Sequence, residues 1–464
     1  MALMPVTDSM FLLAESREHP MHVGGLQLFR PPDDAGPDFL SDLHHRLIAD
    51  DDVRSLFRRR PRGPVSSLGQ WAWTEDQDLD LEYHIRLSAL PRPGRIRELL
   101  ELTSRLHGSL LDRHRPLWEF HLIEGLADGR FATYNKIHHA LVDGVAALLL
   151  LERSLSESPD ATDLRAPWSR STARRAGVRP DSPGAWDTLR SAADAVGELV
   201  GLGPQFVRIA QQAMRDQGAT LPFQAPRSIF NVPITGARRF AAQPWPIARV
   251  RAVGRASGAT LNDVVLAMCS GALRQYLLDL GALPDRSLVA AVPVSLRPSS
   301  ASDLPADVPA GGNAVGMTLC TLATDLADPA ARLAAIHESM RRGKAVYAGM
   351  TPLQVLAVSG LAMAPLALTP IPGVVQLTPP PFNLIISNVP GPAKPLYWNG
   401  ARMEGMYPVS IPYEGQALNI TVTSYADDLE FGLTGCRRSV PSLQRMLTHL
   451  DTALTDLERA AAIP

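Results

Sequence analysis

The sequence contains few lysines and few cysteines, and these two shortages narrow the class of protein. Only three of its 45 basic residues are lysines, and the 464-residue chain has a net charge of -2. A protein that binds nucleic acid through its overall field carries a clear excess of positive charge, so we do not expect this function. The three cysteines, Cys269, Cys320 and Cys436, are far apart and odd in number. They suit neither a disulfide framework nor a zinc site, which favours a reducing cytosol.

The sequence also lacks a long apolar run and a basic leader. No stretch of about 20 apolar residues is free of proline, so no membrane-spanning helix is expected. The early Asp8 and the missing basic residues argue against a signal peptide. The segment from Ala345 to Ala393 has no Asp, Glu, Lys or Arg, and prolines divide it into short pieces. It indicates either a buried helix and strand, or the wall of an apolar tunnel or a membrane-facing surface.

The composition is that of a folded protein with more than one domain. Hydrophobic residues make up 45% and charged residues 20% of the chain. At roughly 100–200 residues per domain, the length predicts two to four domains. Residues 157–184 are rich in Ser, Pro, Arg and Ala without a hydrophobic period, which indicates a linker. We therefore expect an N-terminal domain over 1–156, a linker and connecting helix over 157–225, and a C-terminal domain over 226–464.

Both halves of the chain alternate between strand and helix patterns. Before the linker, the pattern predicts an antiparallel hairpin that turns at Asp128-Gly129, with Trp118 and Leu122 on one face of its first strand. After the linker, a long helix is expected to stop at Gly281. The predicted fold class is α/β (α+β), with two domains that each pack a mixed sheet against helices.

The segment KIHHALVDGVAALLL concentrates polar side chains where a strand meets a helix. His138 and His139 are expected at the end of the strand, and Asp143-Gly144 where the helical run begins. Adjacent strand residues point to opposite faces, so only one of the two histidines faces any given cavity. Histidine is the usual general base for a hydroxyl or amine. The alternative is that the histidines satisfy the core and that Asp143 caps the helix.

Other catalytic signatures are missing from the sequence. It has no G-x-S-x-G elbow, no H-E-x-x-H and no P-loop. This favours direct transfer, in which His139 takes a proton from the acceptor while the acceptor attacks an activated acyl group. No metal site is expected, because no further ligand cluster with suitable spacing accompanies the histidines.

HHALVDG resembles the HHxxxDG motif of the bacterial wax ester synthase/acyl-CoA:diacylglycerol acyltransferase (WS/DGAT) family. That family belongs to the CoA-dependent acyltransferases, with chloramphenicol acetyltransferase and peptide-synthetase condensation domains. Further stretches resemble the family's PLW segment, its ND segment and other family stretches in the expected order. These are RPLWEFHLIEGL, TLNDVVLAMCSGALRQYL, AVPVSLR, GGNAVGMTL, NLIISNVPGP and the opening MPVTDSMFLLAE with HVGGLQLF.

The resemblance implies roles for the residues of the motif. It implies two chloramphenicol-acetyltransferase-like domains with an active-site tunnel at their interface. His139, the second histidine of the motif, would act as base, whereas His138 is less clearly catalytic. Asp143 would pair with an arginine and hold the loop, and Arg297 is our candidate unless it is a surface arginine at a strand end. Gly144 would permit tight packing after the loop.

The other matching segments supply further candidate site residues. Asn262 is expected to donate a hydrogen bond to the reacting acyl or hydroxyl oxygen. Asp263 would support the site, although the spacing from Thr260 is also that of a capping box. The candidates for substrate contact are Pro116, Leu117 and Trp118, unless they belong to the hairpin core.

The resemblance implies an O-acyltransferase that moves a long-chain fatty acyl group from acyl-CoA. The acceptor would be diacylglycerol, giving triacylglycerol, or a long-chain alcohol, giving a wax ester. No cofactor is expected, because acyl-CoA is a substrate. We expect a cytoplasmic protein attached peripherally to the inner face of the membrane and to lipid inclusions. The attachment would lie near Leu353–Leu368 or in the arginine-bearing linker.

Two other functions and one arginine cluster stay open at this point. A related acyltransferase could take its acyl group from a carrier protein, and a non-catalytic protein could coat lipid surfaces. The arginine cluster could meet CoA phosphates or an anionic membrane, or form a solvated basic loop. Its members are Arg58, Arg59, Arg60 and Arg62. The sequence leaves the choice of acceptor, the acyl chain length and the oligomeric state undetermined.

Overall fold

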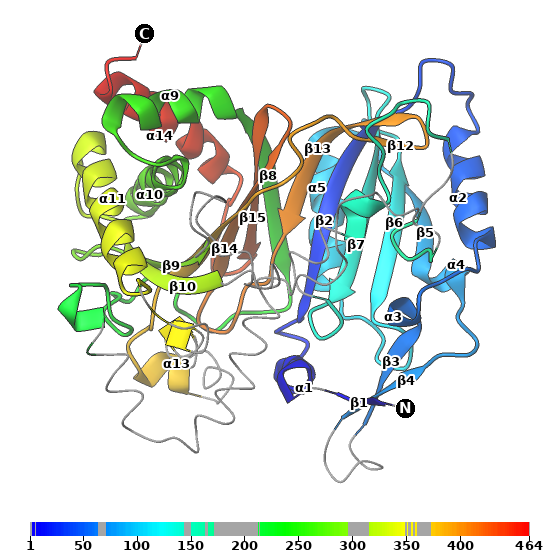
Figure 1. The fold of residues 1–464 in the computed structure, drawn as a ribbon, viewed down its shortest axis with the longest axis horizontal. Coiled ribbons are helices and arrows are strands. Elements are labelled where there is room, and N and C mark those ends of the chain that lie inside the picture. The colour runs from blue at the N-terminus through cyan, green and yellow to red at the C-terminus, as the bar shows by residue number, and fades with distance from the viewer. Residues whose placement is uncertain are drawn as a thin grey trace, which may run out of the picture.

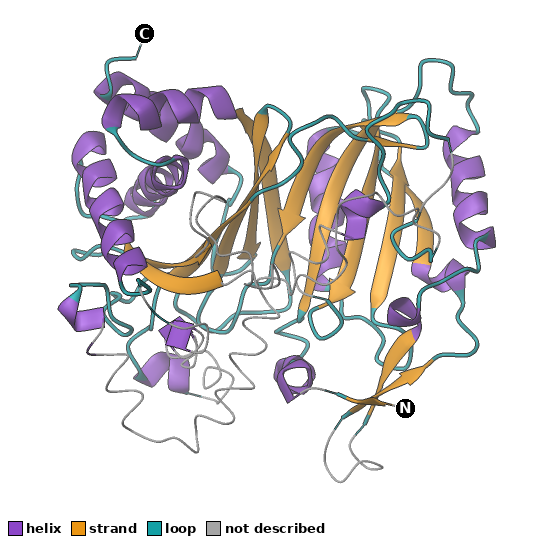
Figure 2. Ribbon diagram, in the orientation of Figure 1, coloured by secondary structure: helices purple, strands orange, loops and turns teal. Residues whose placement is uncertain are grey.

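The computed structural model places the chain in two lobes that stand side by side (Figure 1). Each lobe holds a twisted six-stranded sheet with helices packed against it (Figure 2). The two-domain mixed α/β fold expected from the sequence is therefore confirmed. The residues that the structure describes are 2–4, 6–63, 71–142, 150–162, 166–170, 212, 214–295, 315–348, 350, 354–355, 358–359 and 373–463.

The N-terminal lobe is built on a sheet with the strand order β12-β13-β2-β7-β6-β5. Its strands are β2 (His22–Arg30), β5 (Ile85–Ala89), β6 (Trp118–Glu124), β7 (Phe131–His138), β12 (Tyr397–Trp398) and β13 (Ala401–Val409). Its helices are α2 (Phe39–Ala49), α3 (Ser55–Arg58), α4 (Leu81–His84) and α5 (Ile96–Gly108). Helix α5 lies against the other lobe, where the Phe240 N–H donates to Ser104 Oγ at 2.9 Å.

The C-terminal lobe is built on a sheet with the strand order β10-β9-β11-β14-β15-β8. Its strands are β8 (Arg238–Pro246), β9 (Val289–Ser295), β10 (Val315–Thr321), β11 (Leu384–Val389), β14 (Leu418–Tyr425) and β15 (Asp428–Cys436). Its helices are α9 (Ile247–Ser257), α10 (Leu261–Asp279), α11 (Pro329–Ala345), α13 (Val374–Leu377) and α14 (Arg445–Ala460).

A third, small sheet lies at the lower edge of the molecule in Figure 1, near the N-terminus. It has the strand order β1-β4-β3 and is followed along the same edge by helix α1. The sequence patterns did not predict it, because its strands are only two to four residues long. Its strands are β1 (Ala2–Leu3), β3 (Arg59–Arg62) and β4 (Ala72–Glu75), and α1 runs from Val6 to Ala14.

The elements with strong local signals lie where the sequence places them. The β6–β7 hairpin turns at Gly129, whose φ of 78° suits glycine. Trp118 and Leu122 share one core cluster, as expected for one face of β6. Helix α10 begins with a capping box between Thr260 and Asp263 and ends just before Gly281.

One strand departs from the division of the chain into consecutive domains. Strand β13 lies within residues 226–464, yet it pairs antiparallel with β2, from Arg402 opposite Arg30 to Val409 opposite Gly24. The N-terminal sheet therefore includes a strand from the C-terminal part of the chain. Local patterns do not reveal such an exchange, because they carry no information about the partner of a strand.

The proline-rich stretch before Pro246 also contains a strand. Strand β8 includes Pro244 and Pro246, and it is the edge strand of the C-terminal sheet. Proline is tolerated there because one side of an edge strand has no ladder partner.

The segment from Ala345 to Ala393, which has no charged residues, contains both a buried strand and an exposed apolar side chain. Leu384 and Ile386 of β11 are buried, whereas Leu377 at the end of α13 is 83% exposed. In the part of the chain that the structure describes, we find no helix with the length and apolar character needed to cross a bilayer.

A buried carboxyl group lies where the two sheets meet. Glu430 of β15 is 1% exposed and is hydrogen bonded by the Tyr407 hydroxyl and the Met406 N–H of β13. Burial raises the pKa of Glu430 to about 8, with a contribution from Asp428, while the two hydrogen bonds oppose the rise. Glu430 is therefore mainly protonated at neutral pH.

This pKa predicts how stability depends on pH. Because the pKa of Glu430 is raised from 4.5 to about 8 on folding, stability is full below pH 4.5 and falls as the pH rises toward 8. Glu430→Gln cannot ionise, so it should gain about 1.4 kcal/mol relative to wild type for each pH unit in that window. Urea unfolding at several pH values measures this gain. A difference that does not change with pH, or the same trend in exposed Glu82→Gln, would contradict the prediction.

Candidate active site

The end of strand β7 fixes the two adjacent histidines of the motif. The His138 N–H donates to the Leu117 carbonyl at 2.9 Å, and the His139 N–H donates to the Met21 carbonyl at 2.8 Å. His138 is thus held toward the β6 side and His139 toward the β2 side. Strand β7 ends at His138, and His139 is the first residue of the turn that follows.

His138 is fully buried, and its ring contacts two fixed partners. Its Nδ1 accepts a hydrogen bond from the Ala140 N–H at 3.0 Å. Its Nε2 lies 3.3 Å from Glu15 Oε1. The ring proton therefore belongs on Nε2, facing the carboxylate. One nitrogen is hydrogen bonded and the other faces a buried carboxylate, which favours a supporting role for this histidine.

Glu15 is the residue that organises this side of the site. Its side chain is 1% exposed and accepts hydrogen bonds from the Met21 N–H at 3.1 Å and from Arg113 at 2.9 Å. Burial alone would raise the pKa of Glu15, but His138, the Met21 N–H and Arg113 outweigh it and lower the pKa. Glu15 is therefore a buried, ionised carboxylate that links the first histidine to the end of α1.

His139 lies against the same helix. It is 4% exposed, and its ring stacks on Phe11, with the ring centroids 4.2 Å apart and the planes at 21°. Phe11 and Glu15 are four residues apart, so they lie on one side of the helical turn at the end of α1. One short helix thus supplies the contacts of both motif histidines.

Lys136, two residues before His138, joins strand β7 to strand β6 and helix α5. Its side chain is fully buried and its Nζ lies 2.9 Å from Glu119 Oε2 on β6. It also donates to the carbonyls of Leu106 and Ser109, at 3.1 Å each, at the end of α5. A lysine at the carboxyl end of a helix is favoured by the helix dipole. Lys136 therefore fastens α5 to the sheet close to the histidines.

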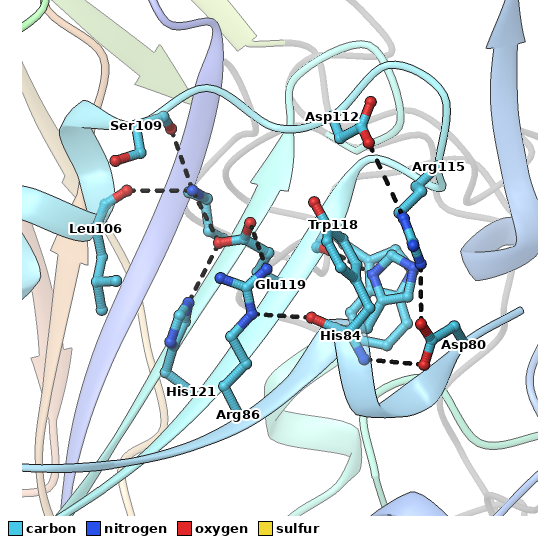
Figure 3. A network of polar contacts seen from close by, with 12 residues as sticks. Asp80, His84, Arg86, Leu106, Ser109, Asp112, Arg115, Trp118, Glu119 and His121 are labelled. Carbon is cyan, nitrogen blue, oxygen red and sulfur yellow. Dashed lines mark hydrogen bonds and ion pairs between the residues drawn. The ribbon is translucent and has the colours of Figure 1, made fainter.

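The Glu119 carboxylate also contacts an arginine and a histidine, in addition to Lys136. Figure 3 shows its carboxylate between His121, at 3.2 Å, and Arg86, at 3.4 Å. Burial alone would raise the pKa of Glu119, but His121 and Lys136 outweigh it and hold the pKa at about 2. The carboxylate stays ionised, and the network ties β5, β6, β7 and α5 together.

The PLW segment lies beside the motif, in the core of the lobe. The Leu117 carbonyl is the acceptor for His138, and Trp118 is 2% exposed. Trp118 stacks on His84, with ring centroids 4.4 Å apart, and its Nε1–H donates to the Phe57 carbonyl at 2.8 Å. Pro116 is buried as well. The described contacts of all three residues are those of the hairpin core.

The ND segment begins helix α10 in the other lobe. Asp263 is buried, closes the capping box with Thr260 and lies 2.8 Å from His337 Nδ1 of α11. Asn262 is half-buried, and its Oδ1 lies 3.4 Å from Asn388 Nδ2 of β11. Asp263 is thus a structural support for the helix that carries Asn262.

Several predicted site residues and the expected tunnel do not appear in the described part of the chain. Asp143, Gly144 and Arg297 lie outside the described residues, as do the linker at 171–211 and most of 351–372. Two apolar hollows share Phe120, Leu151 and Pro167, and neither is lined by His139 or Asn262. The tunnel therefore stays a prediction.

Sequence reasoning missed the residues that hold the histidines and Asn262. Glu15 and Phe11 lie in the opening segment MPVTDSMFLLAE, and Asn388 lies in NLIISNVPGP, both of which resemble family stretches. The signal was present in those matches. The matches did not show which residues contact each other, because Glu15 and His138 are far apart in the sequence.

Two family models cover most of the chain. Residues 3–265 match the wax ester synthase/diacylglycerol acyltransferase catalytic domain, and residues 311–458 match the WS/DGAT C-terminal domain. The chain belongs to the WS/DGAT family. Because it contains the family's catalytic domain, this WS/DGAT protein is an enzyme of the acyltransferase class.

Relatives and solved structures agree with this assignment. The WS/DGAT chain is 54% identical over 463 residues to the diacylglycerol O-acyltransferase tgs2 of Mycobacterium tuberculosis, with 100% of both chains covered. It is 43% identical to the wax ester synthase/diacylglycerol acyltransferase structure from Marinobacter aquaeolei VT8, with a TM-score of 0.79 and 100% of both chains covered.

A more distant structure shares only the fold. The first condensation domain of the calcium-dependent antibiotic synthetase has a TM-score of 0.57 and 17% identity, covering 100% of this chain and 96% of that one. This likeness confirms the two-domain architecture of the WS/DGAT chain.

The contacts of Glu15 lead to a stability prediction. Glu15→Gln removes a carboxylate that bonds Arg113 and faces His138, and we expect a loss of about 1.5–3 kcal/mol at pH 7. Because the pKa of Glu15 is lowered on folding, its contribution is present above pH 4.5 and is lost as the pH falls through the lowered value. The loss should therefore shrink on acidification. Urea unfolding measures it, with exposed Glu18→Gln as control, and an unchanged stability at pH 7 would contradict the role of Glu15.

Proposed function

We propose that this WS/DGAT enzyme transfers a long-chain fatty acyl group from acyl-CoA to the hydroxyl of diacylglycerol or of a long-chain alcohol. His139 is the general base. The placement of the two motif histidines supports this proposal most strongly. His138 accepts a hydrogen bond on Nδ1 from the Ala140 N–H and has its Nε2 3.3 Å from Glu15, whereas the ring of His139 stacks on Phe11.

The reaction needs no covalent acyl-enzyme. The imidazole of His139 takes the proton as the hydroxyl oxygen attacks the thioester carbonyl carbon. The C–S bond then breaks, the new ester forms, and the departing CoA sulfur takes the proton from the imidazolium. The products are an ester and free CoA, and no cofactor is consumed.

Asn262 is proposed to donate a hydrogen bond to the reacting oxygen. Its Oδ1 faces the Asn388 amide, so its own NH2 group is the part that can serve as donor. A donor aimed at the developing oxyanion contributes about 2.7–4 kcal/mol to lowering the barrier. Asp143 and Arg297 are proposed to pair and hold the loop that follows His139.

The names of the relatives support the choice of substrates. The mycobacterial relatives are named diacylglycerol O-acyltransferases, and the Marinobacter structure is named for both activities. We therefore place diacylglycerol first among the acceptors and a fatty alcohol second. Since both acceptors are lipids, we propose that the enzyme works in the cytoplasm, at the inner face of the membrane and on lipid inclusions.

The test is an acceptor-dependent release of CoA. Purified enzyme with palmitoyl-CoA should release free CoA only when dioleoylglycerol or hexadecanol is added. His139→Ala should lower this rate by about 10²–10⁴-fold, because the proton transfer loses its base. His45→Ala, at an exposed position of α2, is the matched control and should retain the rate.

Three outcomes would count against the proposal. Normal turnover by His139→Ala would remove the assigned base. Turnover with an acyl-carrier protein but not with palmitoyl-CoA would indicate a carrier-dependent acyltransferase. No turnover with any donor or acceptor, combined with lipid binding by both wild type and His139→Ala, would indicate a non-catalytic lipid-binding protein.

A further inference from the structure

The outward face of α1 carries large apolar side chains in solvent. Met10 is 45% exposed and Leu13 is 65% exposed, and they lie about one helical turn apart. Leu12 and Asp8 on the other side of the helix are buried. The helix is therefore apolar on its exposed face as well as on the face that packs on His139. Among the described side chains of α1, Asp8 is the one acid, and it points inward.

The small sheet lies at the same edge of the molecule as α1 and carries a further exposed apolar side chain (Figure 1). Leu3 is 65% exposed and lies opposite Ala72, which in turn lies opposite Arg62. Residues that are directly opposite in an antiparallel pair point to the same face, so Leu3 and Arg62 share one face. Arg60, two residues earlier on β3, is half-buried and donates to the His114 carbonyl at 3.4 Å, so Arg62 is the exposed arginine of this strand end. Trp73 points to the opposite face and is buried in the core of the lobe.

We propose that this face is a docking surface for an anionic phospholipid bilayer. The docking surface consists of Leu3, Met10, Leu13 and Arg62. Apolar side chains enter the boundary between headgroups and acyl chains, while arginines pair with the phosphates. The inference rests on the proposed function for its choice of a lipid partner, and it names the segment that the bilayer contacts.

Charge and position favour a bilayer over a protein partner. Exposed Arg62 shares a face with the apolar Leu3, a combination typical of interfacial segments that bind anionic lipid. Both α1 and the small sheet lie along the lower edge in Figure 1. Helix α1 also stacks Phe11 on His139, so the docking surface and the proposed base lie on opposite sides of one helix, which is about 10 Å thick. A lipid acceptor that leaves the bilayer at α1 therefore has a short path to the base.

Two exposed leucines at the end of α10 serve for comparison. Leu278 and Leu280 are 46% and 43% exposed at the end of α10, where Asp279 pairs with His449 of α14. They belong to the other lobe and have about the same exposure as Met10. They provide a matched control for the effect of an added acid on an exposed apolar position.

The test is co-sedimentation of the full-length enzyme with vesicles. Wild type should bind phosphatidylglycerol vesicles and bind phosphatidylcholine vesicles more weakly. Met10→Asp/Leu13→Asp should lower the affinity for the anionic vesicles at least about ten-fold. Arg62→Gln should lower it about five-fold. Leu278→Asp/Leu280→Asp and Arg251→Gln/Arg255→Gln, at exposed sites of the other lobe, should bind as wild type does.

Activity with water-soluble substrates separates docking from catalysis. Met10→Asp/Leu13→Asp should retain wild-type turnover of hexanoyl-CoA with hexanol and lose turnover of dioleoylglycerol in vesicles. Unchanged vesicle binding, an equal loss in the control variants, or a loss of soluble turnover would overturn the docking surface. The expected binding losses in an enzyme that transfers no acyl group would support the docking surface and refute the proposed function.

Discussion

The site depends on how the end of strand β7 is held. Two backbone hydrogen bonds, from His138 to Leu117 and from His139 to Met21, fix the backbone of the two adjacent histidines. The two imidazoles then contact different side chains at the end of α1: Glu15 faces His138, and Phe11 stacks on His139. The same motif thus yields one imidazole locked in the framework and one placed against an apolar ring. This difference is the physical basis for assigning them different roles.

The surroundings of β7 explain why this arrangement is rigid. Lys136 joins the sheet to the end of α5 through Glu119 and two helix carbonyls. Removing one member of such a buried charged group is costly, since the remaining charge loses its partner. The network therefore fixes the strand from one side while α1 fixes it from the other. Glu430, at the junction of the two sheets, is kept neutral by burial, so the lobes meet there without a buried charge.

Local signals in the sequence predicted several helices and strands, whereas the pairing of distant segments could not be predicted from them. The β6–β7 hairpin and the capped start of α10 follow from turn chemistry, periodicity and capping residues. The pairing of β13 with β2 and the contact of Glu15 with His138 join distant parts of the chain. Nothing in the local pattern specifies those partners. The docking surface was missed for a similar reason, because Leu3 and Arg62 become neighbours only through β4.

The central claim is that the imidazole of residue 139 moves the proton, whereas that of residue 138 holds the framework. The most direct test is chemical rescue of His138→Gly and His139→Gly by added imidazole, with palmitoyl-CoA and an alcohol acceptor. The account predicts that imidazole restores part of the turnover of His139→Gly and does not restore that of His138→Gly. Rescue of His138→Gly alone would contradict it.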